Sequence, residues 1–427
     1  MKQVHAADEE PGSPGFRRKC ALLIIDGLGD LPNSELGGKT PLEAAHTPVF
    51  DRLLMAGRYG LVDPIIPGKI PNTHSGTGML MGLLPGQAGL LHRGPVEAAG
   101  AGKVLSAGDV AMRANFASVE DQDGTLQVTD RRAGRITAGT DELAAVLTDI
   151  DLGDEVSASL VPTDQHRGVL VLSGPGLNAA ISNTDPGDGK MPATIKTCLP
   201  LSAGAELTAA KVNRFIAEAH RRLVDHPVNI ARVANGKPAA SGIITRGAGA
   251  HIELDNVLRS LGIKAAMVTG CNTVRGVSRI FGFDVIVDPR FTANVDTDLH
   301  AKIAAVDAAL QDYDMVFMHV KAPDICSHDR QPLAKRDFLQ RLDAALAPLL
   351  DTGVVIAIAA DHSTSSITGF HTADPVPALI WQPGSRQSDA SQTGVPVKFG
   401  EAACRQGNME RQLSNDFLMR VLRTMGY

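Results

Sequence analysis

The sequence predicts an α/β protein built around a mainly parallel β-sheet that is flanked by helices. From residue 20 onward, apolar strand-like runs alternate with amphipathic helical stretches, which is the pattern of a layered α/β fold. Three of these runs end in loops that carry carboxylates, and ligands bind beyond the carboxyl ends of the strands in open α/β sheets. Between residues 89 and 239 the runs become shorter and alternate in polarity, which indicates a smaller α+β domain inserted into the first.

Four continuous apolar runs are the expected strands of the main sheet. They span residues 20–26, 315–320, 353–360 and 376–381. Three other stretches repeat apolar residues at helical spacing beside charged residues, which predicts helices at 206–224, 334–350 and 412–425. In the middle of the chain, shorter strands separated by turn residues are expected within 109–120, 124–136 and 166–174.

These patterns divide the chain into two domains. Residues 18–88 and 240–427 are assigned to the core, and residues 89–239 to the inserted domain. The run that begins at Ser241 is taken as the point where the core resumes. The residues before Arg18 have no periodic pattern and are expected to be a flexible lead-in.

Composition narrows the class of protein. The chain has 427 residues, 44% of them hydrophobic and 21% charged, and its net charge of -6 is too small for a disordered chain. The apolar runs are far shorter than the roughly 20 residues of a membrane span, and no secretory signal is visible, so we expect a cytoplasmic protein with no membrane partner. Five scattered cysteines without a C-x-x-C pair argue against a disulfide scaffold or a zinc ribbon. A mildly acidic chain with 12 Phe, 3 Tyr and 1 Trp gives no reason to expect nucleic acid, whereas a homo-oligomer is compatible with it.

Aspartates and histidines gather after the predicted strands or in their loops. The set is Asp26, Asp324, His328, Asp361, His362 and His371. Carboxylates favour Mn or Mg and imidazoles favour Zn or Mn, so together they predict a divalent metal centre. Each residue taken alone is more often a turn, cap or structural residue, and the prediction depends on all six being placed alike.

A loop rich in small and hydroxyl-bearing residues spans 67–85 and opens into an apolar, helix-like run. Thr73, Ser75 and Thr77 are candidate nucleophiles there, and a helix N-terminus would present N–H groups to an anion. No base lies nearby in the sequence, but coordination to a metal would deprotonate a hydroxyl. The alternative is an ordinary helix cap.

Arginines are dense in short loops although the chain is acidic overall. The set is Arg93, Arg113, Arg131, Arg132, Arg135, Arg167, Arg246 and Arg275. Because the guanidinium fork matches carboxylate and phosphate groups, these loops predict a binding site for a small polyanion. The alternative for any one of them is a solvated surface charge.

Through a series of motifs in family order, the chain resembles the archaeal-type, cofactor-independent (2,3-bisphosphoglycerate-independent) phosphoglycerate mutase family of the alkaline phosphatase superfamily. They include IIDGLGDLP (24–32), DRRAGRI (130–136), KAPDICSHD (321–329) and ADHSTSSITGFHTADPVP (360–377), and they continue over nearly the whole chain from residue 20. The resemblance implies an alkaline-phosphatase-like, metal-binding core and an inserted, transferase-like domain that binds the substrate.

The resemblance also implies two metal ions, of Mn, Mg or Zn, and no 2,3-bisphosphoglycerate cofactor. One ion would be held by Asp324, His328 and His371. The other would be held by Asp26, Asp361, His362 and the hydroxyl of the nucleophile.

The nucleophile loop departs from the family pattern. The family has Ser within P-G-S-D, followed by G-Y-D-P, whereas this chain has Pro71-Asn72-Thr73-His74 and then Gly82-Leu83-Leu84-Pro85. An ungapped alignment makes Thr73 the nucleophile, with Ser75 as the alternative if the loop is shifted by two residues. His74 replaces an aspartate, which removes a negative charge and adds a candidate proton donor or phosphate contact.

The implied reaction interconverts 3-phosphoglycerate and 2-phosphoglycerate, a glycolytic isomerisation, through a phosphothreonyl enzyme. The candidate catalytic residues are Thr73, His74, Arg113, His166, Arg246 and Arg275, and the candidate substrate-binding residues are Asp109, Asp130, Arg131, Arg132 and Arg135. The altered loop keeps a second hypothesis open, a metal-dependent phosphohydrolase or phosphotransferase acting on another small phosphate or phosphonate. The complete ligand set argues against a third, a non-enzymatic phosphate- or metal-binding relative.

Overall fold

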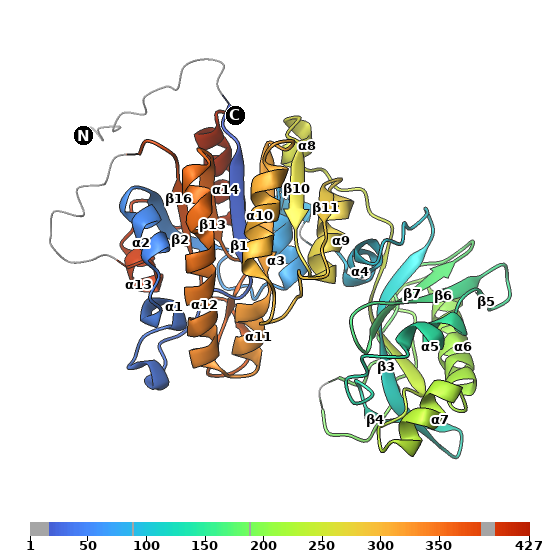
Figure 1. Cartoon of the computed structure of the whole chain (residues 1–427). Helices are drawn as coiled ribbons and strands as arrows, with labels where there is room; N and C mark the ends of the chain where they lie inside the picture. The colour runs from blue at the N-terminus through green and yellow to red at the C-terminus, as the bar shows by residue number, and fades with distance from the viewer. Residues whose placement is uncertain (1–16, 88, 188, 386–397) are drawn as a thin grey trace. The chain divides into compact units, whose positions relative to one another are not determined.

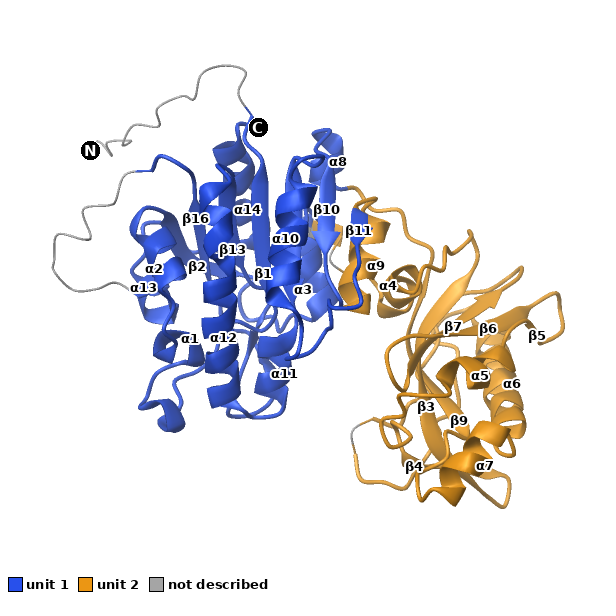
Figure 2. Ribbon diagram, viewed as in Figure 1, with its two compact units in different colours: residues 1–85, 256–270, 284–427 blue, residues 86–255, 271–283 orange. Residues whose placement is uncertain are grey.

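The structure, a computed structural model, describes residues 17–87, 89–187, 189–385 and 398–427. The chain forms two compact units, which Figure 2 colours separately. Unit 1 comprises residues 1–85, 256–270 and 284–427, and unit 2 comprises residues 86–255 and 271–283. The lead-in expected before Arg18 lies outside the described residues except for Arg17.

Unit 1 is built on an eight-stranded sheet in the order β11-β10-β12-β1-β13-β16-β2-β17. The strands in that order are β11 (Asp284–Ile286), β10 (Ala265–Val268), β12 (Met315–Val320), β1 (Cys20–Ile25), β13 (Val355–Ala359), β16 (Val376–Trp381), β2 (Arg58–Asp63) and β17 (Gln412–Leu413). Only β16 runs antiparallel to its neighbours in this sheet, so the prediction of a mainly parallel sheet is confirmed.

The central strands β12, β1 and β13 are buried along their whole length. Parallel strands covered by helices on both faces have this continuous apolar character. In Figure 1, α10 (Leu299–Ala309) and α12 (Pro332–Leu346) lie over one face of the sheet, and α3 (Thr73–Leu80) and α14 (Ser414–Met425) lie behind it. The predicted helix at 412–425 begins at Ser414, because Gln412 and Leu413 pair with β2 instead.

Short elements complete unit 1. They are α1 (Pro41–Ala44), α2 (Pro48–Met55), α8 (Val257–Ser260), α11 (Ala322–His328), α13 (Glu401–Arg405), the 3-10 turns at Ser34–Leu36 and Ala347–Asp351, and the hairpin of β14 (Ser363–Thr364) and β15 (His371–Thr372). The helix predicted at 334–350 is α12, which tightens into the second of these turns.

Unit 2 is an antiparallel sheet with helices packed on it. The strand order is β5-β6-β7-β3-β4-β8, and β9 pairs with the other edge of β3. Its strands are β3 (Val110–Gln122), β4 (Thr125–Asp130), β5 (Ile150–Asp151), β6 (Ser157–Pro162), β7 (Arg167–Ser173), β8 (Ala193–Thr194) and β9 (Gly242–Ala250). Its helices are α4 (Arg93–Gly100), α5 (Thr140–Ala145), α6 (Glu206–Leu223), α7 (Pro227–Ala234) and α9 (Asn272–Ile280). The 3-10 turn at Pro85–Gln87 begins at the last residue of a unit 1 segment and continues into unit 2.

Two expectations for this region need correction. The run after Ser241 does not return to the main sheet, because it forms β9 and pairs with β3 from Ala117↔Gly242 to Val110↔Ala250. Residues 240–255 therefore belong to unit 2, and so does α9. The strand expected within 124–136 stops at Asp130, whose carboxylate accepts hydrogen bonds from the backbone of Arg132 and Gly134 and holds a turn there.

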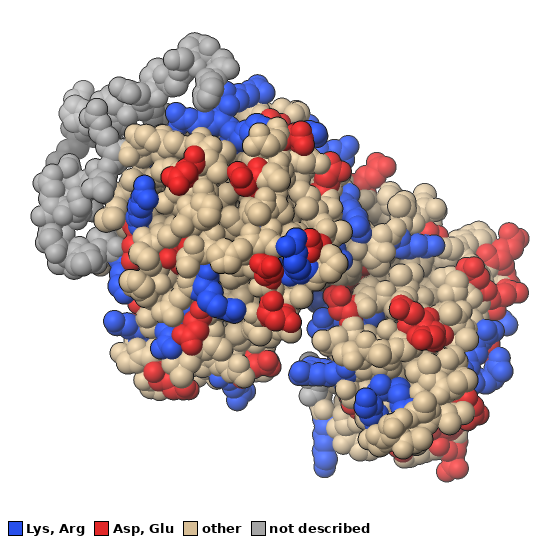
Figure 3. All heavy atoms as spheres, in the orientation of Figure 1, with Lys and Arg blue, Asp and Glu red and all other residues tan. Residues whose placement is uncertain are grey.

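Two observations describe the helices and one face of the surface. None of the helices in the described part of the chain has both the length and the apolar character of a bilayer span. On the face drawn in Figure 3, acidic and basic side chains are interspersed over both units. The small net charge of -6 is therefore not divided into two broad patches of opposite sign on this face.

Candidate functional site

The strand order of unit 1 brings three predicted ligand loops together. Strands β12, β1 and β13 are adjacent and parallel, so their carboxyl ends lie at one edge of the sheet. Asp26 directly follows β1, Asp324 lies on α11 just after β12, and Asp361 follows β13 by one residue. All three side chains are buried.

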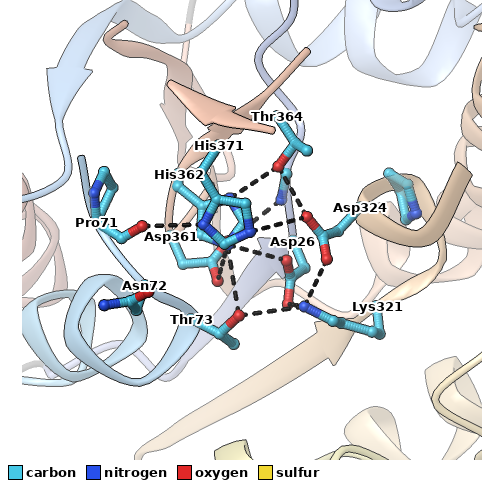
Figure 4. Close-up of polar contacts among 12 residues, drawn as sticks. Asp26, Pro71, Asn72, Thr73, Lys321, Asp324, Asp361, His362, Thr364 and His371 are labelled. Carbon is cyan, nitrogen blue, oxygen red and sulfur yellow. Dashed lines mark hydrogen bonds and ion pairs between the residues drawn. The ribbon is translucent and has the colours of Figure 1, made fainter. Parts of the chain in front are cut away.

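The β14–β15 hairpin carries the next predicted ligand. Thr364 and His371 are cross-strand neighbours, which places His371 beside the three carboxylates. His371 Nε2 lies 3.5 Å from Asp324 Oδ1, and its ring stacks on that of His362 with 3.7 Å between centroids. Nδ1 of His371 donates to the carbonyl of Pro71 at 3.0 Å, so the hairpin also holds the loop that precedes α3 (Figure 4).

Thr73 begins α3 and faces this cluster. Its Oγ1 lies 3.4 Å from His362 Nε2 and 3.1 Å from the Nζ of Lys321 (Figure 4). The helix approaches so closely because residue 76 is glycine, where a Cβ would collide with the backbone carbonyl of Asp361. Ser75 instead turns back to the start of α3, where its hydroxyl bonds the N–H of Asn72 at 3.1 Å and its carbonyl at 3.0 Å.

The other two residues of the loop lie differently. Thr77 is buried on α3 with no exposed surface. His74 lies on the first turn of α3, next to Thr73, and is half-buried. The loop thus presents the Thr73 hydroxyl to the cluster and uses Ser75 to complete the capping box with Asn72, the N-cap of α3.

All six predicted metal ligands meet here, and we call Asp26, Asp324, His328, Asp361, His362 and His371 the metal-ligand cluster. Two groups have ligand atoms within 4.8 Å of one another, namely Asp26, Asp361 and His362, and Asp324, His362 and His371. His362 is common to both groups. His328 adjoins the second, with its Nε2 3.3 Å from Asp324 Oδ2 and 3.3 Å from His371 Nε2.

The cluster contains three buried carboxyl groups, and the ammonium of Lys321 pairs with two of them, Asp26 and Asp324. Burial and the neighbouring Asp26 raise the pKa of Asp361 well above its usual range. Burial also opposes ionisation of Asp26 and Asp324, but the ammonium of Lys321 brings the pKa of both carboxyls below the usual value. Asp26 Oδ1 and Asp361 Oδ2 are buried without a hydrogen-bond partner among the described residues. Unpartnered carboxylate oxygens beside imidazole nitrogens fit a divalent cation.

Two residues at this edge were missed by the sequence reasoning. Lys321 Nζ lies 2.9 Å from Asp26 Oδ2, 2.7 Å from Asp324 Oδ2 and 3.1 Å from Thr73 Oγ1. His319, buried on β12, lies 2.9 Å from Asp26 Oδ2 through its Nε2. The available signal was a polar residue at the end of an otherwise apolar strand, just before Asp324.

Burial also determines the charge of the shared imidazole. Removal of His362 from water lowers its pKa to about 3, so the ring is neutral at physiological pH. His328, which is more exposed, has a raised pKa because it is hydrogen-bonded to Asp324. A neutral imidazole is the form that binds a metal.

Unit 2 carries a second cluster, of opposite charge. Arg113 on β3 pairs directly with Arg246 on β9, and Asn115 pairs with Arg167 on β7. Since cross-strand partners and alternate residues of a strand share a face, these side chains lie on one face of the sheet. We call Arg93, Arg113, Arg167, Arg246 and Arg275 the arginine cluster.

Glu97 on α4 is the central counter-charge of the arginine cluster. It accepts from Arg93 Nε at 3.2 Å and lies 3.6 Å from a terminal nitrogen of Arg113. Asn272 and Thr273 of α9 hydrogen-bond the same carboxylate at 2.8 and 3.0 Å. Burial alone would raise the pKa of Glu97, but Arg113 and Arg93 bring it below the usual value. No sequence pattern had singled out Glu97.

One carboxylate does not neutralise the cluster. Burial and the neighbouring Arg93 lower the pKa of Arg113, and burial with Arg167 and other guanidinium groups lowers that of His166 to about 3. Arg113 Nε, Arg275 Nε and His166 Nδ1 are buried without a hydrogen-bond partner among the described residues. Buried unpartnered ring and guanidinium nitrogens in positive surroundings fit an anion.

The remaining predicted residues of unit 2 are three arginines and two aspartates. Arg131 forms a two-pronged ion pair with Asp185, at 2.8 and 2.6 Å, and Arg132 and Arg135 are exposed in the turn that follows it. Asp109 and Asp130 accept from backbone N–H groups of their own loops, so their carboxylates hold turns.

Comparison with known proteins gives a consistent result. The profile of the 2,3-bisphosphoglycerate-independent phosphoglycerate mutase family matches residues 55–229. A protein of that name from Methanosphaera stadtmanae is 38% identical over 404 residues, which cover 94% of this chain and 96% of the relative. One from Methanopyrus kandleri is also 38% identical, over 421 residues that cover 96% and 97% of the two chains.

Solved structures agree with these relatives. A Pyrococcus horikoshii protein superposes with a TM-score of 0.80 at 31% identity, covering 96% of this chain and 98% of that one. The cofactor-independent phosphoglycerate mutase of Thermoplasma acidophilum superposes with a TM-score of 0.68 at 30% identity, covering 96% and 100%. The resemblance inferred from the motifs is thereby confirmed. The chain belongs to the archaeal-type, 2,3-bisphosphoglycerate-independent phosphoglycerate mutase family.

Proposed function

We propose that this protein is a metal-dependent phosphoglycerate mutase that interconverts 3-phosphoglycerate and 2-phosphoglycerate through a phosphothreonine at residue 73. The observation that carries the proposal is the position of the Thr73 hydroxyl, which faces both His362 and Lys321 at the metal-ligand cluster. Membership of the family supplies the substrate class, and the replacement of the family's serine by threonine keeps a hydroxyl in place.

Two divalent ions fit the residues present. Asp324, His328 and His371 would hold one, and Asp26, Asp361 and His362 the other, with His362 near both groups. Bound there, the ions would lower the pKa of a coordinated hydroxyl and offset charge that develops on the transferred phosphoryl group.

In the first step the oxygen of Thr73 attacks phosphorus, and the bond between phosphorus and the C3 oxygen of the substrate breaks. Thr73 loses its proton and the C3 oxygen gains one, which leaves phosphothreonine and glycerate. Lys321 donates a hydrogen bond to Thr73 Oγ1 at 3.1 Å and so favours the deprotonated oxygen. We assign a contact with the phosphoryl group to His74, which is next to Thr73 on the first turn of α3.

In the second step the C2 hydroxyl of glycerate attacks the phosphothreonine. The bond between phosphorus and Thr73 Oγ1 breaks, Thr73 regains a proton, and the product is 2-phosphoglycerate. We assign the binding of glycerate to the arginine cluster, helped by Arg131 and His166. The unpartnered donors of Arg113, Arg275 and His166 suit the carboxylate of this intermediate.

The substitutions around Thr73 favour one competitor, a phosphohydrolase. If water rather than the C2 hydroxyl attacked the phosphothreonine, the product would be free phosphate. Exclusion of water from the phosphorylated enzyme is therefore what separates the two activities.

The test supplies the purified full chain and Mn²⁺ with 3-phosphoglycerate. Formation of 2-phosphoglycerate is followed through enolase, and free phosphate is measured in parallel. We expect 2-phosphoglycerate to form with little phosphate. Phosphate without 2-phosphoglycerate would replace the mutase by a phosphohydrolase, and neither product would indicate another small phosphate or phosphonate as substrate.

Two variants test the nucleophile. Thr73→Ala is expected to lower kcat by about 10³-fold or more, because the attacking oxygen is gone. Ser75→Ala removes only the helix-cap hydroxyl and should keep its activity while losing about 1 kcal/mol of stability. An active Thr73→Ala protein together with an inactive Ser75→Ala protein would assign the nucleophile to Ser75.

A further inference from the structure

The hydroxyl of Thr364 lies between the two groups of the metal-ligand cluster. Its side chain is fully buried on β14. Oγ1 donates a hydrogen bond of 2.7 Å to Asp324 Oδ1 and lies 3.0 Å from Nδ1 of His362 (Figure 4). One hydroxyl thus joins a carboxylate of one group to the imidazole that both groups share.

The number of protons available determines the direction of these two hydrogen bonds. A hydroxyl has one proton to donate, and Thr364 gives it to Asp324, which as a carboxylate only accepts. The contact between Thr364 Oγ1 and His362 Nδ1 must then have the imidazole as its donor. In a neutral ring the proton on Nδ1 leaves a lone pair on Nε2.

The nitrogen that is left free is the one that faces the carboxylates. His362 Nε2 lies 3.3 Å from both Asp26 Oδ1 and Asp361 Oδ2. These are the two buried oxygens that have no hydrogen-bond partner among the residues described. An Nε2–H tautomer would point a proton at the place where a cation would be held.

We propose that Thr364 is a positioning residue that fixes the Nδ1–H tautomer and the ring orientation of His362, so that the Nε2 lone pair points at the Asp26–Asp361 group. The inference rests on the metal site of the proposed function. Hydrogen bonds to the far nitrogen of a metal-binding histidine set which nitrogen is free, and their loss typically lowers metal affinity roughly 10- to 100-fold.

The backbone of Thr364 is held on both sides. Its N–H donates to the carbonyl of Gly29 at 3.0 Å, and its carbonyl accepts from Lys335 Nζ at 3.2 Å. Lys335 is itself bound to Asp30 at 2.9 Å, and both side chains are fully buried. The hydroxyl is therefore presented from a fixed backbone.

The space around the hydroxyl is equally restricted. Gly27, whose φ is +65°, packs against it, and a Cβ there would lie 2.7 Å from Thr364 Oγ1 and 2.9 Å from the Cα of Asp324. Close packing of this kind leaves the threonine side chain little freedom to rotate away from Asp324 and His362.

The direct test is the tautomer of His362 in the metal-free, full-length protein. With ¹⁵N-labelled histidine at neutral pH, we expect long-range ¹⁵N–¹H spectra to show a protonated Nδ1 and an unprotonated Nε2 for His362. The His362→Gln variant identifies these resonances by their loss. A protonated Nε2 in the wild-type protein would overturn the proposal.

Matched variants test the consequence for metal binding. Thr364→Val removes the hydroxyl and keeps the shape, and we expect calorimetry to give a Mn²⁺ affinity roughly 10- to 100-fold below that of the wild type. Thr364→Ser restores the hydroxyl and is expected to recover the affinity to within about threefold. Thr372→Val makes the same change on the paired strand, where the hydroxyl accepts a hydrogen bond from the N–H of Asp374, and should bind Mn²⁺ like the wild type.

The outcomes distinguish a failure of the role of Thr364 from a failure of the proposed metal-dependent function. Excess Mn²⁺ should restore the kcat of Thr364→Val, because the hydroxyl acts through the affinity of the site. Equal Mn²⁺ affinity in Thr364→Val and wild type would refute the role of Thr364. A wild-type protein that binds no Mn²⁺ would refute the proposed function, but the tautomer could still be read in the metal-free protein. If Thr364→Val does not fold, the tautomer of His362 in the wild-type spectrum still decides between the two outcomes.

Discussion

The metal-ligand cluster of unit 1 has an excess of carboxylates, and the arginine cluster of unit 2 has an excess of guanidinium groups. The first sets three buried carboxylates against Lys321 and leaves oxygens of Asp26 and Asp361 without hydrogen-bond partners among the described residues. The arginine cluster places several guanidinium groups around Glu97, and the Nε atoms of Arg113 and Arg275 have no hydrogen-bond partner among the described residues. One cluster therefore suits cations and the other suits anions.

A balanced ion pair elsewhere in the chain shows why the imbalance is informative. Lys335 and Asp30 are fully buried as one cation and one anion, 2.9 Å apart, and they hold the backbone around β14. A buried charge that only supports the fold is paired in this way, because an unpaired one is costly. Clusters that keep an excess of one charge are instead candidates for binding an ion of the opposite charge.

Removal of divalent cations is expected to have the largest effect, and only on unit 1. Chelation with EDTA should lower the rate of 2-phosphoglycerate formation by about 10³-fold or more, because the carboxylates of Asp26, Asp324 and Asp361 would lose their counter-ions. The enolase-coupled assay measures the loss and its recovery on adding Mn²⁺.

The arginine cluster provides the control for the chelation experiment. Binding of inorganic phosphate to the arginine cluster, followed by NMR, should persist in EDTA. Turnover that survives complete chelation would contradict the metal site.

Loss of Arg113 should have the next largest effect, with the opposite pattern. Arg113→Met removes a buried donor, and kcat/KM for 3-phosphoglycerate is expected to fall by about 10²- to 10³-fold while Mn²⁺ affinity is unchanged. Steady-state kinetics and calorimetry measure the two quantities. Arg221→Met, at an exposed position paired with Glu218, is the matched control and should behave like the wild type. A parallel loss of Mn²⁺ affinity in Arg113→Met would mean that the two clusters are not independent.

Lys321 is the residue whose replacement should make unit 1 depend more on metal. In Lys321→Met the carboxylates of Asp26 and Asp324 lose their ammonium, so the metal-free protein is expected to lose about 2 kcal/mol or more of stability. Thermal unfolding in EDTA measures this loss, and Mn²⁺ should reverse it. The exposed Lys237→Met serves as control. Unchanged stability without metal would show that Lys321 does not balance the carboxylates.

The smallest expected effect is a shift in the titration of His166. Burial and the surrounding guanidinium groups hold the pKa of His166 at about 3, below the ordinary pKa that it has in the unfolded chain. Above that ordinary pKa the residue costs the folded state nothing. As the pH falls from there toward 3, the unfolded chain binds the proton first and the folded state loses stability. A bound anion favours imidazolium, so inorganic phosphate should raise this pKa by roughly one unit. NMR titration of the ring measures the shift.

His220 of α6 is the internal control for that titration. It lies in the same unit and is hydrogen-bonded to the carbonyl of Ser241 at 2.8 Å. Its resonances should not respond to phosphate. Equal responses of His166 and His220 would indicate non-specific binding rather than a site in the arginine cluster.

Much of the core was predictable because its signals are local. Strands β12 and β16 have the bounds that were expected, since a buried strand appears as a short continuous apolar run. The metal-ligand cluster was predictable for the related reason that strand ends meet at one edge of a parallel sheet. The β9 strand was assigned to the wrong sheet, because an apolar run does not identify its pairing partner.

Local pattern by itself determined the central buried strands and the long amphipathic helices, and the placement of Asp and His residues after those strands determined that a metal centre was to be expected. Tertiary structure alone decided which polar atoms finally meet. Thr73 and Lys321 are 248 positions apart, and Thr364 and Asp324 are 40 apart. No short-range periodicity links such residues. Their contacts, the balance of charge in each cluster and the tautomer of the shared histidine arise only when the strands are assembled.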